Sequence, residues 1–94
     1  MSELIQILRF RTDDPDAVLA SSHRYHAAAA GRTTFTSEHL GLDVETGEHV
    51  LIVTFPSREA ADRNNALPET AAAATELAAL ATEGPSFSTI QAVG

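Results

Sequence analysis

The sequence predicts a single α+β domain, residues 1–94, in which four strands form an antiparallel sheet and helices pack against it. Three observations lead to this class. A chain of 94 residues has the length of one domain. Four short segments are rich in apolar, β-branched or aromatic residues, which favour strands. Two alanine-rich segments lie between them and carry the start and stop signals of helices.

The first strand and the first helix follow from the N-terminal third of the chain. Leu4–Thr12 has the composition of a strand. The Asp-Asp-Pro that follows should end the strand and start a helix, because aspartate can cap the first turn and proline fits within it. This helix should run to about Ala30, and Gly31 is a suitable residue to end it.

The middle of the chain predicts a hairpin. Residues 33–42 are rich in threonine and phenylalanine, and residues 48–55 contain the apolar run Val-Leu-Ile-Val, so both segments favour strands. The Asp-Val-Glu-Thr-Gly between them is typical of a turn. Pro56 should end the second of these strands, and Ser57 can cap a short helix that reaches about Asn64.

The last third predicts one more helix and one more strand. Pro68 is a suitable first residue for a helix over 68–83. Gly84 and Pro85 should stop this helix, and residues 87–93 should form the last strand. The order of the main elements is β-α-β-β-α-β, the ferredoxin-like arrangement with a four-stranded antiparallel sheet.

The first and third strands predict a sheet with two apolar faces, because successive side chains of a strand point to opposite faces. In the third strand, Leu51, Val53 and Phe55 lie on one face and Val50 and Ile52 on the other; the first strand likewise has Leu4, Leu8 and Phe10 on one face and Ile5 and Ile7 on the other. In a ferredoxin-like fold both helices cover the same face. A second copy, packed sheet against sheet into an α+β barrel, would cover the other face, so we expect a homodimer.

Composition and charge exclude several kinds of partner. The formal net charge is −7, with six arginines and no lysine, so the chain lacks the clustered cations that nucleic acids and anionic membranes require. With no cysteine, disulfides, thiol catalysis and cysteine-bound metals are excluded. The start, MSELIQILRF, does not have the pattern of a signal peptide, and no apolar run approaches the ~20 residues of a membrane span, so we expect a cytoplasmic protein.

Two stretches of the chain, IVTFPSREAADRNNALPET and the DDPDAV helix start, are similar to a known family, as are the order and length of the elements over the whole chain. Through these features the chain resembles the dimeric α+β barrel superfamily, and within it the antibiotic biosynthesis monooxygenase-like proteins. The resemblance implies a dimer of face-packed sheets with a pocket in each subunit between sheet and helices. Known activities of the superfamily include cofactor-independent quinol-type oxygenation, haem degradation, polyketide cyclisation and lactone isomerisation.

Departures from the family's sequence pattern exclude some of these activities. The chain has no tryptophan, whereas many monooxygenase-like members carry one near the pocket. The asparagine–tryptophan–histidine set of the haem degraders therefore cannot be assembled. Haem degradation is not expected, and we expect no cofactor.

The segment SSHRYHAAAA, residues 21–30, is the best candidate for a site. On a helical wheel Tyr25 lies on the same stripe as Val18, His26 lies at its edge, and His23 lies nearer solvent. Tyr25 and His26 should then face the sheet, with His23 at the rim. The small side chains of 27–30 and 71–74 would leave room for a pocket, although alanine is also the best helix former.

His26 and Tyr25 are the candidate catalytic residues. An imidazole titrates near working pH and could deprotonate a phenol or an enol, while Tyr25 could orient a ligand oxygen. In the alternative interpretation, His26 packs as a half-buried aromatic ring whose nitrogens bond nearby carbonyls or water. His23 and His26 are helical neighbours, but they lack a nearby carboxylate and an HExxH context, so we expect no metal site.

Arg9 and Arg11 are further candidates for ligand binding, together with His23. Both arginines share a strand face with apolar residues and are costly to bury unpaired. They could hold an anionic or phenolic ligand, form a salt bridge at the end of the sheet, or bridge to a glutamate across the dimer. We expect His39 and His49 to be exposed to solvent. Asn64 and Asn65 are explained by turn formation without a ligand.

Two functional hypotheses follow. In the first, the chain is a cofactor-independent oxygenase or cyclase that acts on a small aromatic or polyketide-like molecule with His26 as base. In the second, it is a non-catalytic ligand-binding or dimerisation module. The sequence contains no nucleophile elbow or phosphate loop that would decide between them.

Overall fold

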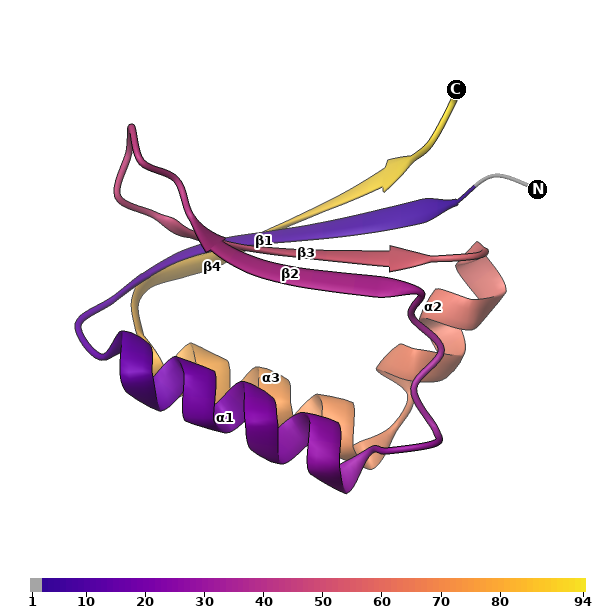
Figure 1. Cartoon of the computed structure of the whole chain (residues 1–94), viewed down its shortest axis with the longest axis horizontal. Helices are drawn as coiled ribbons and strands as arrows, with labels where there is room; N and C mark the ends of the chain where they lie inside the picture. Colours follow the sequence, from indigo (N-terminus) through magenta and orange to yellow (C-terminus); the bar gives the residue numbers. More distant parts are fainter. Residues whose placement is uncertain (1–2) are drawn as a thin grey trace.

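The structure is a computed structural model that describes residues 3–94 (Figure 1). The elements follow one another as β1 (Leu4–Thr12), α1 (Pro15–Ala28), β2 (Ser37–Leu42), β3 (His49–Phe55), α2 (Arg58–Asn65), α3 (Pro68–Leu80) and β4 (Ala81–Gln91). The four strands pair antiparallel in the order β2-β3-β1-β4. This confirms the predicted ferredoxin-like sheet, with the short helix α2 preceding α3.

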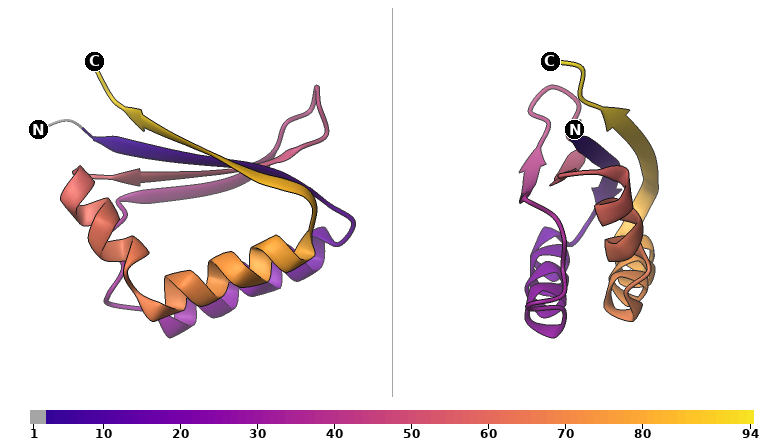
Figure 2. Two further views of the ribbon diagram at one scale, coloured as in Figure 1. Left: turned by 180° about the vertical axis from the view of Figure 1, so that it is seen from behind. Right: turned by 90° about the vertical axis from the view of Figure 1, so that its right-hand side faces the viewer.

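The molecule has two layers. Helices α1 and α3 lie side by side beneath one face of the sheet, and α2 closes the space between the layers at one end (Figures 1 and 2). Within residues 3–94 no helix or strand covers the opposite face, toward which the β2–β3 hairpin projects (Figure 1). None of the helices in this part of the chain is long and apolar enough to cross a membrane.

The predicted helix starts are confirmed in atomic detail. The Asp14 side chain accepts a hydrogen bond from the backbone N–H of Ala17 (3.1 Å), which caps α1. Ser57 accepts from the N–H of Ala60 (3.1 Å) and caps α2 in the same way. Pro68 is the first residue of α3. These caps satisfy amides that no intrahelical carbonyl can reach.

The second strand begins later than predicted, at Ser37 rather than at residue 33. Thr34 is drawn away from the sheet toward α2: its N–H donates to Asn64 Oδ1 (3.2 Å), and its hydroxyl donates to the Ala60 carbonyl. Because the Thr34 N–H is bonded to Asn64, it is not available for pairing with a neighbouring strand.

The last helix ends earlier than predicted, at Leu80, and the last strand begins at Ala81. Pairing with β1 takes over residues that local propensity would leave in the helix, since Thr12 lies opposite Ala81 and its hydroxyl donates to the Leu80 carbonyl (2.8 Å). Gly84 is therefore a strand residue in an irregular stretch of the β1–β4 ladder, not a helix stop. Its φ of +80° and its closeness to the Arg9 carbonyl both require glycine.

The two-faced pattern of the strands is confirmed. On the helix side the core gathers at the α2 end of the molecule, with a cluster formed by Leu4, Val53, Phe55, Ala60 and Ala61. The other face carries the apolar residues Ile5, Ile7, Val50, Ile52 and Ile90. We call these five the open-face patch. Ile52 and Ile90 remain 37% and 45% exposed.

Candidate functional site

A cavity of about 180 Å³ lies between the sheet and the two long helices. Its walls are mostly apolar and come from every strand and from all three helices, including Leu8, Leu40, Leu51, Val53, Leu77 and Phe87. The predicted pocket between sheet and helices therefore exists in this chain.

The cavity is open because the helices present small side chains to the sheet. Helix α3 has no buried residue, and it contributes Ala73 and Ala74 to the wall. Helix α1 buries only Val18 and Ser21. Methyl and hydroxymethyl groups cannot span the distance between the layers, and the large buried side chains Phe10 and Phe55 line the cavity without closing it.

A polar network is built into the cavity wall around Tyr25. Asn64 donates from Nδ2 to the Tyr25 hydroxyl (3.2 Å), and that hydroxyl lies 2.8 Å from Thr70 Oγ1. The Asn64 side chain is fixed from its other end, because Oδ1 accepts the Thr34 N–H (3.2 Å). Asn64 is only 4% exposed, so it is a buried part of the site and not the turn residue that the sequence predicts.

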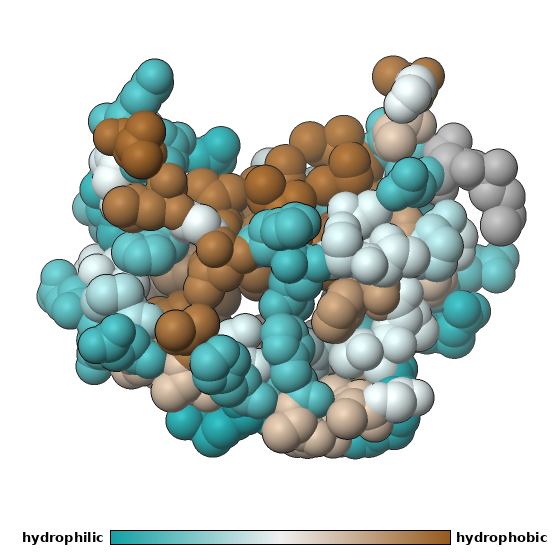
Figure 3. Space-filling model, in the orientation of Figure 1, coloured by the Kyte–Doolittle hydropathy of each residue, from teal (hydrophilic) through white to brown (hydrophobic). Residues whose placement is uncertain are grey.

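A second polar feature stands at the rim, where α1 faces β2. His26 Nε2 lies 2.9 Å from Glu38 Oε1, which links the two elements. The His26 side chain is 43% exposed and the Glu38 side chain 13%. Glu38 lines the cavity, while His26 packs outside it with its ring 5.9 Å from that of Phe35. On this side of the molecule, Figure 3 shows hydrophilic surface crossing from the sheet to the helices, with hollows beside it.

The sequence-predicted site residues separate into two groups. Tyr25 lines the cavity and His26 stands at its rim, 5.7 Å away between ring centroids. His23 is exposed on α1 and does not line the cavity. Within residues 3–94 no three potential metal-ligating side chains come together.

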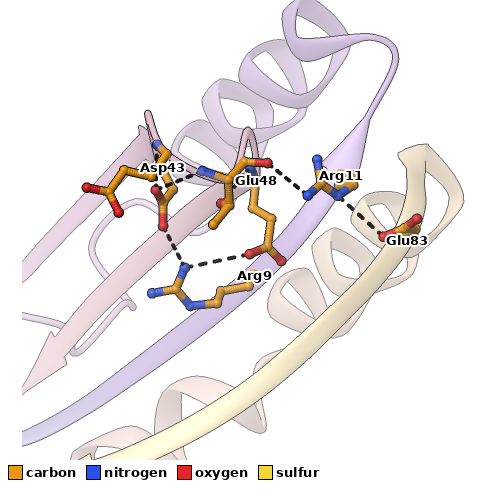
Figure 4. Close-up of polar contacts among 7 residues, drawn as sticks. Arg9, Arg11, Asp43, Glu48 and Glu83 are labelled. Atoms are coloured by element: carbon orange, nitrogen blue, oxygen red, sulfur yellow. Dashed lines mark hydrogen bonds and ion pairs between the residues drawn. The ribbon is translucent and has the colours of Figure 1, made fainter.

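Arg9 and Arg11 lie on the opposite face of the sheet, outside the cavity (Figure 4). Arg9 pairs with Asp43 (3.3 Å) and Glu48 (3.9 Å). Arg11 donates to the Thr46 carbonyl (2.8 Å) and pairs with Glu83 (3.4 Å). Of the alternatives left open by the sequence, both arginines form ion pairs within the chain at the end of the sheet.

The contacts around Asp43 also lower the pKa of its carboxyl group. Backbone N–H groups of Glu45 and Thr46 donate to Asp43, and Arg9 adds a weaker contribution, so the pKa of this carboxyl lies below its usual range. The two backbone N–H groups bond to Oδ1 and lower this pKa more than Arg9 does, which bonds to Oδ2 at 3.3 Å.

The two remaining histidines differ from one another. His39 is exposed, as expected. His49 is partly buried, contrary to the prediction: its ring stacks on Phe10 with centroids 5.6 Å apart, and its Nδ1 is buried without a hydrogen-bond partner in the described part of the chain. The register explains the error, because His49 is paired with Phe10 on the helix side of the sheet.

Comparison with solved structures identifies the fold. The chain superposes on SnoaB, a cofactor-independent oxygenase from Streptomyces nogalater, with a TM-score of 0.81 and 23% identity, covering 100% of this chain and 96% of that one. Rv0793 from Mycobacterium tuberculosis gives 0.78 and 22%, covering 99% and 97%. An antibiotic biosynthesis monooxygenase gives 0.73 and 19%, covering 100% of both chains. No family model matches the chain, and no curated protein does.

The chain thus has the fold of the antibiotic biosynthesis monooxygenase-like structures, which confirms the resemblance seen in its sequence. Sequence reasoning missed several polar groups of the cavity wall, among them Gln6, Glu38, Asn64 and Thr70. Two of them could have been found from strand alternation. Gln6 interrupts the apolar face of β1, and Glu38 shares a face of β2 with Leu40.

Proposed function

We propose that the cavity binds a small, mostly apolar aromatic molecule. The observation that carries this proposal is an apolar space of about 180 Å³ with one polar cluster, Tyr25–Asn64–Thr70, built into its wall. A cavity of about 150 Å³ is enough to bind benzene. Apolar walls supply affinity, and a few fixed polar groups supply orientation.

The reaction class we propose is cofactor-independent oxygenation or cyclisation. The fold shared with SnoaB supports the oxygenase. In this proposal Tyr25 bonds an oxygen atom of the substrate, and His26 at the rim acts together with Glu38, its hydrogen-bond partner, in removing a proton. The second candidate is a non-catalytic binding protein. It is favoured because His26 Nε2 is bonded to Glu38 and His26 does not line the cavity.

We further propose that the open-face patch binds a second copy of the chain. Five large apolar side chains gather there, and no other element among residues 3–94 covers them. A two-fold interface uses the same patch on both subunits, so each copy covers the apolar face of the other and no further partner is needed. The arginines at the end of this face already have acidic partners, so they do not oppose the contact.

Ligand binding tests the proposed cavity directly. Thermal melting with 1-naphthol and with 1,4-dihydroxynaphthalene should show a ligand-dependent rise of the melting temperature, because binding to the folded state stabilises it. Ala73→Leu should abolish the shift by filling the cavity, whereas Ala78→Leu, at an exposed position of α3, should retain it. A shift of equal size in Ala73→Leu would contradict the proposed site.

Oxygen uptake then separates the two candidate functions. With 1,4-dihydroxynaphthalene as substrate and no flavin, haem or metal added, the oxygenase requires uptake above the rate without protein. Uptake should fall by about 10²–10⁴-fold in His26→Ala if His26 is the base. Binding without uptake would favour the non-catalytic protein.

A further inference from the structure

We infer that Glu38 forms a hydroxyl-recognition subsite in the cavity, held in place by His26. The ligand donates a hydroxyl hydrogen to the free carboxylate oxygen of Glu38, which selects uncharged hydroxyaromatic molecules over their ethers and over aromatic carboxylates. This inference rests on the proposed function, since it assumes that the cavity binds an aromatic molecule.

Charge is the first argument. Among the described residues that line the cavity, Glu38 is the single carboxylate, and no arginine or histidine accompanies it. The arginines nearest along α1 and its C-terminal end are already paired outside the cavity, Arg24 with Glu76 and Arg32 with Glu69. An anionic ligand would therefore meet a like charge and no cation, at a position where burial makes repulsion costly.

The second argument is the geometry of the carboxylate. Glu38 Oε1 is engaged by His26 Nε2 at 2.9 Å, so a proton lies on Nε2 when the carboxyl group is ionised. Oε2 has no hydrogen-bond donor among residues 3–94. A half-buried carboxylate with one bonded and one unbonded oxygen is an acceptor that is ready for a donor from the ligand.

The direction of Glu38 is fixed by the sheet. Glu38 lies opposite Val53 in the β2–β3 ladder, and Leu40 lies opposite Leu51; all four line the cavity. Alternation along the strand therefore points Glu38 inward, and the bond to His26 limits its freedom to turn away. His26 is thus a positioning residue, which acts on the ligand through Glu38.

Glu38 and the Tyr25 cluster are two of the polar features of the cavity wall that a ligand could contact. Glu38 offers an acceptor at the rim, and the Tyr25 cluster offers a hydroxyl and an amide that can bond to a ligand oxygen. A ring that carries a hydroxyl group and a second oxygen would satisfy both groups, with its carbon skeleton against the apolar walls. A ligand without a donor leaves Oε2 desolvated and unpaired.

The test compares three probes that share one ring system: 1-naphthol, 1-methoxynaphthalene and 1-naphthoate. Isothermal titration calorimetry should show that the wild type binds 1-naphthol about 10- to 100-fold more tightly than the ether, the range expected for a hydrogen bond to a charged group. It should bind 1-naphthoate more weakly still. In Glu38→Gln the preference for naphthol over the ether should fall to within about threefold. The matched control Glu45→Gln changes an exposed hairpin glutamate and should keep the wild-type preference.

His26 is tested by the same ratio of affinities, which a purely structural role would not move. His26→Ala should reduce the preference for naphthol, and His26→Gln should restore part of it, because its amide can donate to Glu38. An unchanged preference in Glu38→Gln would overturn the subsite while leaving the cavity as a binding site. If the wild type bound none of the three probes, both the proposed function and this subsite would be wrong.

Discussion

Both faces of the sheet carry large apolar side chains, but the polar groups on the two faces have different partners. On the helix side, Gln6, Glu38 and Asn64 stand in the wall of a cavity. On the open side, Arg9 and Arg11 are matched by acidic groups and a carbonyl of the same chain (Figure 4). The helix side retains polar groups that can still bond to a small molecule. The open side has its charges paired and its apolar patch uncovered, which is the chemistry of a protein interface.

This difference has a packing cause. Alanine-rich helices cover the helix side incompletely, so the space left over has the size of a small ligand. On the open side no helix or strand among residues 3–94 packs over the apolar patch. Four predictions, ordered from the largest expected effect to the smallest, test this comparison.

The largest effect should come from a charge in the open-face patch. Ile52→Asp should abolish the dimer, because an unpaired carboxylate would be buried between two sheets. Sedimentation velocity at micromolar concentration should show a dimer for the wild type and a monomer or unfolded chain for the variant. Leu19→Asp, on the helix layer and 47% exposed, is the control that should remain dimeric. If Ile52→Asp unfolds, Ile52→Ser allows the same measurement. A monomeric wild type would refute the dimer.

The next effect contrasts two phenylalanines on the helix side of the sheet. Phe55 is 1% exposed within the core cluster, whereas Phe87 is 56% exposed at the edge strand. Phe55→Ala should lower the free energy of unfolding by about 3–5 kcal/mol, as expected for a buried aromatic. Phe87→Ala should change it by less than about 1 kcal/mol. Urea denaturation measures both, and equal losses would show that the two ends of this layer are packed alike.

Glycine substitutions test the open side at its end near the arginines. A Cβ at Gly84 would lie 2.7 Å from the Arg9 carbonyl oxygen, and the φ of +80° already disfavours a side chain there. Gly84→Ala should therefore destabilise the chain by about 1–3 kcal/mol. Gly41→Ala is the matched control, because a Cβ at Gly41 meets no atom within 4 Å. A neutral result for Gly84→Ala in thermal or urea unfolding would contradict the tight approach of the two strands.

The smallest effect concerns Asp43. Because its pKa is lowered in the folded chain, its contribution to stability is fully present above the unfolded value of about 3.9 and is lost as the pH falls through the folded value. Arg9→Gln should raise this pKa only slightly, since the backbone donors of Glu45 and Thr46 dominate. A carboxyl NMR titration of wild type and variant measures it. If the pKa of Asp43 returned to its ordinary value in Arg9→Gln, Arg9 and not the backbone donors would be the main cause of the lowering.

Much of the fold could be predicted because its signals are local. The caps at Asp14 and Ser57, the proline at the start of α3 and the alternation along β1 depend on residues within a few positions of one another. The extent of α3 could not be predicted in this way. Local propensity favours helix through residue 83, but pairing with β1 takes Ala81 onward into the sheet.

The candidate site was predictable only in part. Its location and the inward direction of Tyr25 follow from the helical stripe and from the small residues of the helices. The partners of Tyr25 and His26 did not follow, because Thr70, Asn64 and Glu38 lie 45, 39 and 12 positions away along the chain. No pattern within one element indicates which side chain will bond to it across the cavity.

The sequence by itself determined the class of fold and the two apolar faces of the sheet, since each depends on composition or on the period of a single element. The tertiary structure alone decided which polar groups meet. It buried Asn64 against Tyr25, set Glu38 between His26 and the cavity, and paired Arg9 and Arg11 with acidic residues of distant segments. The physical reason is that hydrogen bonds and ion pairs act over a few ångströms in space, and only the folded chain brings distant residues within that range.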